Sequence, residues 1–193
     1  MCTSFSSLSP QKQITLQYQH ELMKGKRAFS NDLKTPYPLV DADPHASRVI
    51  KYMRGSDYAL WAAGAGAAPA AIYAMEMADP TSRLGTKALR PTLKLATWLG
   101  FAGGFLLAYQ TSSLRLWGWK ENAREIEMDK KELGQLAKEG KPLYGETDLP
   151  EYIQGVAHRN SMWSQLKFGV LPWFNLVNHQ HHGTDASKYK SEE

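Results

Sequence analysis

Apolar residues are concentrated in two stretches of this 193-residue chain, and the flanking sequence is polar. Residues 58–75 contain no charged side chain, and residues 95–114 contain none between Lys94 and Arg115. As a helix rising about 1.5 Å per residue, the first stretch would reach roughly 27 Å, close to the ~30 Å hydrocarbon layer of a bilayer. The pattern therefore predicts two transmembrane helices.

The borders of the second stretch strengthen this interpretation. Trp117 and Trp119 follow it, and with Lys94 and Arg115 they form aromatic and cationic flanks that are typical of a membrane interface. The first stretch is rich in alanine and poor in leucine, so a buried helix of a soluble protein is the alternative there. Because the linker 76–94 is short, the two helices are expected to form an antiparallel hairpin.

Small residues recur every four positions in both stretches and would give each helix a ridge on one face. Close backbone packing drives helix association in lipid, where the surroundings are as apolar as leucine. The simpler alternative is that alanine and glycine are common in membrane helices. The predicted helix-packing residues are Ala62, Gly66, Ala70, Ala96, Gly100, Gly104 and Ala108.

The rest of the chain predicts polar arms with no independent globular core. Residues 1–57 form the N-terminal arm, whose prolines keep its later part extended before a short helix. Residues 115–139 predict a charged amphipathic helix whose narrow apolar stripe suits one partner surface. Residues 140–193 form an irregular C-terminal arm. Its apolar run at 168–177 is too short to span a membrane, which leaves an interfacial or partner-bound segment, or a loop buried in the chain's own fold. The predicted fold class is a mostly α membrane protein.

Composition and motifs argue against catalysis. The net charge of +4 and the pI near 9.1 come from basic residues scattered among acids, so no nucleic-acid partner is expected. The single cysteine, Cys2, excludes an internal disulfide or an iron–sulfur cluster ligated by this chain alone. The glycines near Gly64 resemble a dinucleotide fingerprint, but Pro69 replaces the third glycine. We predict no catalytic or cofactor-binding residue, and no cofactor.

The histidines near the C-terminus are either metal ligands or part of a polar tail. His179, His181 and His182 would hold zinc if Asp185 joined them, but polar tails often contain such runs without metal, and His158 has no supporting spacing. The sequence therefore predicts no metal site. The acids of the charged helix are predicted to lie on its solvated face; they are Glu121, Glu125, Glu127, Asp129 and Glu132.

Three motifs together resemble a known family. They are DADPHASRVIKYMRGSDY at 41–58, LWGWKEN at 116–122 and PLYG at 142–145. They are similar to the fungal-type 21 kDa accessory subunit of mitochondrial respiratory complex I, over roughly residues 35 to 180. The resemblance implies a non-catalytic subunit of NADH:ubiquinone oxidoreductase in the mitochondrial inner membrane, with other complex I subunits as partners.

Two functions are compatible with this sequence. The first is a structural or assembly subunit that is anchored by the hairpin and clamps neighbouring subunits with its arms. The alternative is a free-standing assembly, import or lipid-binding factor that uses its basic and aromatic arms on membrane lipids, cardiolipin among them. The distribution of lysine and arginine around the hairpin favours both termini on the matrix side.

Overall fold

The structure is a computed structural model that describes residues 35–80, 86–162, 174–184 and 189. The chain divides into two units, Met1–Thr35 and Pro36–Glu193, and every described helix belongs to the second. These helices are α2 (Ala46–Lys51), α3 (Gly55–Ala78), α4 (Thr86–Leu116), α5 (Ala123–Lys138) and α6 (Glu151–Ser161). Within the described residues no strand occurs.

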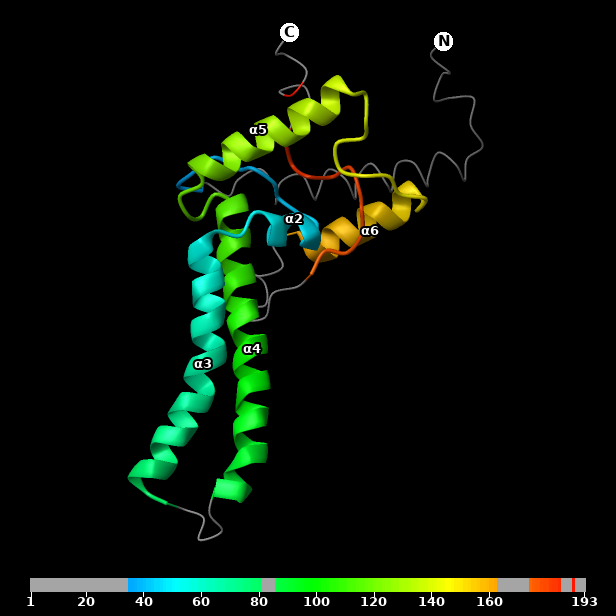
Figure 1. The fold of residues 1–193 in the computed structure, drawn as a ribbon. Coiled ribbons are helices and arrows are strands. Elements are labelled where there is room, and N and C mark those ends of the chain that lie inside the picture. Colours follow the sequence, from blue (N-terminus) through cyan, green and yellow to red (C-terminus); the bar gives the residue numbers. More distant parts are fainter. Residues whose placement is uncertain (1–34, 81–85, 163–173, 185–188, 190–193) are drawn as a thin grey trace, which may run out of the picture. The chain divides into compact units, whose positions relative to one another are not determined.

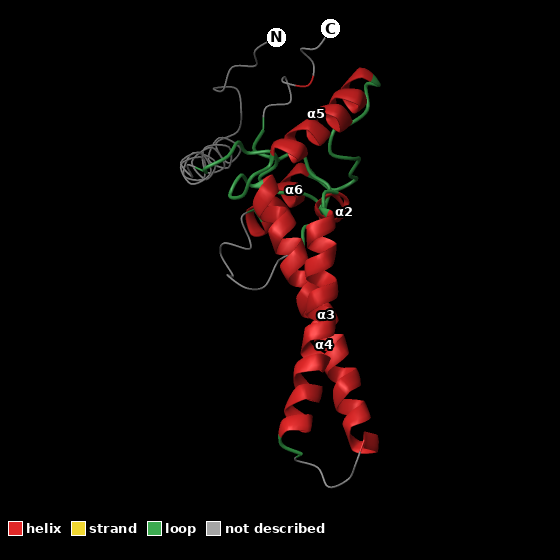
Figure 2. Cartoon of the chain, turned by 60° about the vertical axis from the view of Figure 1, so that its left-hand side comes forward, coloured by secondary structure: helices red, strands yellow, loops and turns green. Residues whose placement is uncertain are grey.

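The two long helices, α3 and α4, run antiparallel and lie side by side (Figures 1 and 2). Their backbones approach closely at two glycines of α4. A Cβ atom added to Gly104 would lie 2.6 Å from the carbonyl oxygen of Trp61, and one added to Gly100 would lie 2.6 Å from that of Gly64. The indole N–H of Trp61 donates a hydrogen bond to the Phe101 carbonyl at 3.0 Å. Only glycine permits this spacing.

A hydrophobic core surrounds the C-terminal end of α4. It contains residues from α2, from the stretch before α2 and from the last turns of α4, namely Val40, Ala46, Val49, Tyr52, Met53, Ala108, Tyr109 and Leu116. The hydroxyl of Ser112 donates to the Val49 carbonyl at 2.8 Å, which ties α2 to α4. A smaller cluster brings Trp117 against Ala42. The prediction that the chain has no globular core of its own is therefore wrong.

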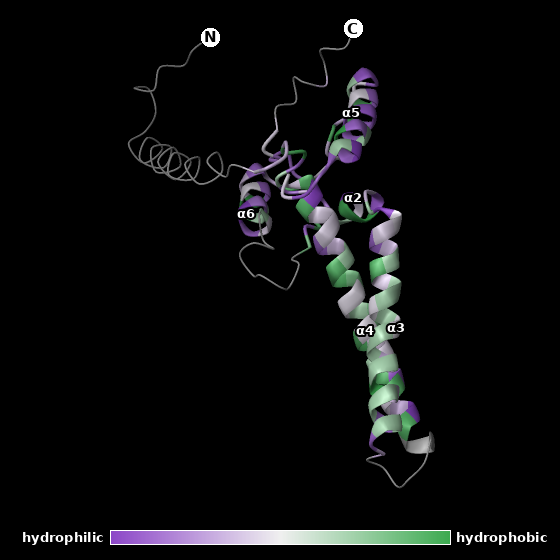
Figure 3. Cartoon of the chain, turned by 90° about the vertical axis from the view of Figure 1, so that its left-hand side faces the viewer, coloured by the Kyte–Doolittle hydropathy of each residue, from purple (hydrophilic) through white to green (hydrophobic). Residues whose placement is uncertain are grey.

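The predicted transmembrane hairpin is also wrong. Among the described residues, no helix combines the length and the apolar character needed to cross a membrane. The stretch 95–114 misled because its last turns are apolar for another reason: Ala108 and Tyr109 belong to the internal core. Alanine and glycine in α3 add little hydrophobicity per residue, and Figure 3 shows much of α3 in pale colours.

We refer to two regions of this unit. The head comprises residues 36–54, residues 108–122, α5, α6 and the C-terminal segment 174–184. The arm comprises α3 and residues 86–107 of α4, which extend away from the head helices α2, α5 and α6 (Figures 1 and 2). Of the predicted apolar run at 168–177, residues 168–173 lie outside the described residues. Its described part contacts the chain's own α4, where the rings of Phe174 and Tyr109 lie 4.8 Å apart.

Candidate functional site

The stretch that immediately precedes α2 lies between the end of α4 and the C-terminal segment. On one side the Val40 amide donates to the Leu116 carbonyl at 3.0 Å. On the other side the Ala42 amide donates to the His182 carbonyl at 3.0 Å. Two regions that are distant in sequence therefore hold this extended stretch through its backbone, and its acidic side chains are carried into the interior.

Asp41 is the first of these acids and is fully buried. Its carboxylate lies 2.6 Å from Nη1 of Arg48 and 2.8 Å from Nδ1 of His182. Burial by itself raises the pKa of Asp41, but the interactions with His182 and Arg48, together with the amide of Asp43, outweigh it and hold the pKa below its ordinary value. The acid therefore stays ionised inside the head.

His182 connects this acid to the C-terminal segment. Its second ring nitrogen, Nε2, lies 2.9 Å from the carbonyl oxygen of His179. Both ring nitrogens thus face oxygen atoms, one on Asp41 and one on the His179 backbone, which fixes the orientation of the ring. The ring also stacks on Tyr144, with centroids 3.7 Å apart and planes at 12°. His182 is therefore a structural contact of the head.

Arg48 pairs with a second buried acid, Asp129 of α5. Burial by itself lowers the pKa of Arg48, but the charges of Asp41 and Asp129 outweigh it and raise the pKa. Asp129 also accepts a hydrogen bond from the Tyr189 hydroxyl at 2.5 Å. Burial and this acid raise the pKa of Tyr189, so the phenol remains a donor at neutral pH. One guanidinium therefore links α2, α5 and the stretch before α2.

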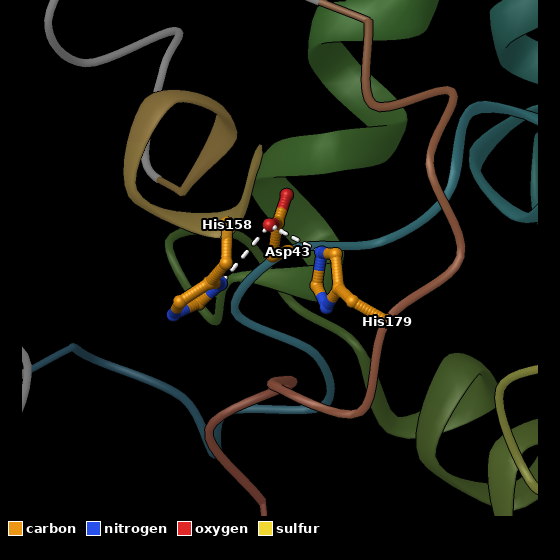
Figure 4. Close-up of side chains that lie close together, drawn as sticks. All are labelled: Asp43, His158 and His179. Atoms are coloured by element: carbon orange, nitrogen blue, oxygen red, sulfur yellow. Dashed lines mark hydrogen bonds and ion pairs between the residues drawn. The ribbon is translucent and has the colours of Figure 1, made fainter. Parts of the chain in front are cut away.

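Asp43 forms a separate cluster with residues of α6 and the C-terminal segment (Figure 4). Its Oδ2 atom lies 3.0 Å from Nδ1 of His158 and 2.8 Å from Nε2 of His179, and it accepts a 2.6 Å hydrogen bond from the Ser161 hydroxyl. Burial by itself raises the pKa of Asp43, but these hydrogen bonds outweigh it and lower the pKa. The three groups Asp43, His158 and His179 have the chemistry and spacing of metal ligands.

A third ionic group joins the two long helices to α5. Asp57, in the first turn of α3, pairs with Arg115 in the last turn of α4, and both side chains are buried. Arg54 reaches Glu125 of α5, with Nη2 and Oε2 2.5 Å apart. Glu125 also lies 3.3 Å from Arg115, between their Oε1 and Nε atoms. These contacts place charges where the arm begins.

A cavity of about 440 Å³ opens beside Arg48 and His182, lined by residues from α2 and its N-cap, from α5, from the loop at 143–145 and from the C-terminal segment. His45, Lys51, Glu132 and Asn178 are among its lining residues. Lys51 and Glu132 pair across it at 2.7 Å, so its charges are largely balanced from within the chain. The cavity has no arrangement that we associate with a nucleophile and a general base.

The predicted helix-packing residues occupy different positions along the arm and the head. Gly100 and Gly104 lie against α3, while Ala108 and Ala96 are buried. The remaining three, Ala62, Gly66 and Ala70, lie on the exposed side of α3. The less exposed side of α3 carries Trp61, Gly64, Ala65, Ala68 and Ile72 instead.

The four residues predicted as membrane-interface anchors do not share one environment in the structure. Arg115 is buried and paired with Asp57, and Trp117 is buried against Ala42. Trp119 packs next to the same small cluster and Lys94 is exposed on α4. The aromatic and cationic residues at the end of α4 are therefore parts of the head.

Sequence reasoning missed most of the ionic groups of the head. The prediction of a solvated acidic face on α5 is wrong for Glu125 and Asp129, which are 0% and 2% exposed. Asp185 lies outside the described residues, and the acids that meet these histidines are Asp43, which contacts His179, and Asp41, which contacts His182, each more than a hundred positions away. One signal was available: acids at 125, 129 and 132 with Leu133 follow a helical spacing and share one face.

Two family models match the chain, one over its N-terminal part and one over its C-terminal part. A family model for the NADH-ubiquinone oxidoreductase complex I, 21 kDa subunit matches residues 34–121. A second model, for the C-terminal part of the NADH-ubiquinone oxidoreductase 21 kDa subunit, matches residues 130–193. The first match covers the stretch before α2 together with α3 and α4, and the second covers α6 and the C-terminal segment.

A relative from Neurospora crassa supports the same assignment over most of the chain. The NADH-ubiquinone oxidoreductase 20.9 kDa subunit of that fungus is 49% identical over 161 residues, which cover 83% of this chain and 85% of the relative. The resemblance read from the three motifs is thus confirmed. The chain belongs to the 21 kDa subunit family of complex I, the NADH-ubiquinone oxidoreductase, and is an accessory subunit of that complex.

Proposed function

We propose that this chain is a non-catalytic structural subunit of mitochondrial complex I whose arm packs against neighbouring subunits. The observation that supports this proposal is that several large apolar side chains of the arm are exposed. Large apolar residues with at least 60% exposure on the arm are Met75, Met77, Leu95, Trp98 and Leu99. Several large apolar side chains exposed on one part of a protein mark an interaction site.

The positions of these side chains indicate how the arm is used. They lie in the last turns of α3 and the facing turns of α4, away from the core at the other end of α4. Two helices can cover only one side of each other, so the remaining faces need a further partner. Since the family is that of a large complex, apolar helices of other subunits are the partners that we expect.

The head supplies rigidity in this proposal. Its ionic groups are mostly satisfied from within the chain, through the pairs of Asp41 with Arg48 and of Glu125 with Arg54. A side chain already paired and buried contributes little to recognition of a partner. The proposed division is therefore that the head sets the geometry of the arm, and the arm contributes the contact with other subunits.

A single substitution on the arm tests this proposal. Trp98 is 71% exposed, so Trp98→Glu leaves the fold of the chain intact while it places a charge on the proposed contact. Burying an unpaired carboxylate at an apolar interface costs several kcal/mol, so we expect incorporation into complex I to fall at least about tenfold. The measurement is native gel separation of mitochondrial membranes with an antibody against a tag on the chain.

Trp98→Leu is the matched control, because it keeps an apolar side chain at the same position and should incorporate normally. If the Trp98→Glu chain enters the complex as well as the control, the arm is not the contact. A chain that migrates only as a small free species in both forms would contradict the subunit role itself and favour the free-standing factor.

A further inference from the structure

Asp43, His158 and His179 come from three separate parts of the chain and point at one place (Figure 4). One ligand-type atom from each lies within 4.8 Å of the others. Asp43 and His179 are buried, and the side chain of His158 is 19% exposed. The cluster thus has two inner groups and one rim group through which an ion could enter.

We propose that this cluster is a divalent transition-metal site, with zinc as the cation that its ligands suit best. Two imidazole nitrogens and one carboxylate oxygen are a common protein ligand set for Zn²⁺. Nothing in the composition or in the family description assigns a metal to this chain, and the site departs from the sequence-based prediction of no metal. No local pattern in the sequence indicates such a cluster, because Asp43 and His158 are not near His179 along the chain.

The distances between the ligand atoms are close to those that zinc requires. Bonds of about 2.0–2.1 Å in a tetrahedral site hold neighbouring ligand atoms roughly 3.3 Å apart. Oδ2 of Asp43 lies 3.0 Å from Nδ1 of His158 and 2.8 Å from Nε2 of His179. These two distances need only a few tenths of an ångström more to admit the ion in place of the hydrogen bonds, and the third, between the two imidazole nitrogens, is within 4.8 Å.

Neighbouring groups determine what must change when the ion binds. The His181 amide donates to Nδ1 of His179 at 3.2 Å, which favours a proton on Nε2, facing Asp43; the amide nitrogen of the Asn175 side chain also lies 3.2 Å from Nε2 and must move when the ion binds there. Coordination by Nε2 moves that proton to Nδ1, so the His181 amide must turn away. Ser161, which donates to Asp43 at 2.6 Å, can orient the carboxylate as a positioning residue.

The fourth position belongs either to water or to His181. The ring centroid of His181 lies 5.5 Å from that of His158 and 6.1 Å from that of His179. His181 is partly exposed, so its side chain can rotate toward the cluster once its amide has turned. Three protein ligands and a water would suit an accessible zinc site, whereas four protein ligands would close it.

The test is a titration of the purified full-length chain with Zn²⁺ in competition with a chromogenic chelator. We expect one ion per chain with a Kd of about 1 µM or tighter. X-ray absorption at the zinc edge of the loaded chain should show at least two imidazole ligands and one or two oxygens. Backbone amide resonances should shift most at His181 and its neighbours.

His158→Gln is the decisive variant, because its amide can still donate to Asp43 but is a poor zinc ligand. It should weaken binding at least about thirtyfold. His45→Gln is the matched control: it alters a histidine that caps α2 outside the cluster and should bind like the wild type. Circular dichroism with and without zinc verifies that each variant is folded.

The proposal is overturned by a wild-type Kd weaker than about 100 µM, or by equal binding in the wild type and His158→Gln. If His158→Gln does not fold, the absorption spectrum of the wild type decides instead. A spectrum with fewer than two imidazoles would place the zinc elsewhere on the chain and would equally overturn the site.

Discussion

The head buries several acids beside its apolar core, whereas the arm exposes large apolar side chains. In the head, the acids Asp41, Asp43 and Glu125 are at most 2% exposed. On the arm, Trp98 and Met75 are each 71% exposed. A soluble monomer usually shows the reverse, with apolar residues inside and charged residues at the surface. The comparison supports our proposal that the head is held together from within the chain and that the arm packs against other subunits.

The two regions also differ in how their contacts depend on one another. In the head, one cation serves two acids, as Arg48 does for Asp41 and Asp129, so the removal of that one group takes an ionic contact from both. In the arm, contact consists of backbone meeting backbone at Gly100 and Gly104. The head should therefore respond sharply to loss of charge, and the arm to added volume.

The largest effect is expected from Arg48→Ala. The substitution leaves Asp41 and Asp129 buried without their shared cation, and breaking a buried ion pair on one side typically costs about 3–5 kcal/mol. We expect the free energy of unfolding to fall by about that amount. Urea denaturation of the purified chain, followed by circular dichroism, measures it.

Lys51→Ala is the matched control for Arg48→Ala, since both residues lie on α2 and pair with acids of α5. The Lys51 side chain is 59% exposed, and its 2.7 Å pair with Glu132 is screened by solvent. Its loss should cost less than about 1 kcal/mol. Equal destabilisation by the two substitutions would remove the distinction between the buried and the solvated charges of the head.

A smaller effect is expected when alkali ionises Tyr52. Burial raises the pKa of Tyr52 from 10.0 to about 12, although the charge of Arg48 opposes this. Because the folded state holds this proton more tightly than the unfolded state does, the contribution to stability is complete below about pH 10 and is lost as the pH rises toward about 12. Two pKa units correspond to roughly 2–3 kcal/mol.

The measurement for Tyr52 is the free energy of unfolding between about pH 9 and pH 11.5, compared with that of Tyr52→Phe. The variant lacks the ionising group and also its 3.1 Å hydrogen bond to Glu132. It should start slightly less stable and lose less stability with rising pH. Parallel curves for the two proteins would show that Tyr52 does not carry the alkaline loss.

The positions of the helices could be predicted from the sequence, but the contacts that form the head could not. Helical periodicity and prolines located the helices, because those signals are local: Pro150 precedes α6 and Gly140 follows α5. The head depends on contacts between distant residues, such as Asp43 with His179, which no local pattern records. The membrane prediction failed because uncharged length was taken as evidence of a lipid environment, whereas the end of α4 is apolar to fit the head.

The last and smallest effect distinguishes two adjacent glycines of the arm. A Cβ atom at Gly104 would lie 2.6 Å from the Trp61 carbonyl oxygen, a backbone atom that cannot swing aside, whereas one at Gly103 would meet nothing within 4 Å. Gly104→Ala must therefore push α3 and α4 apart, at a cost of about 1–2 kcal/mol. Gly103→Ala should instead stabilise the chain by about 0.5–1 kcal/mol, since alanine favours a helix. Thermal denaturation of both variants measures the difference, and equal melting temperatures would show that close backbone contact does not hold the arm together.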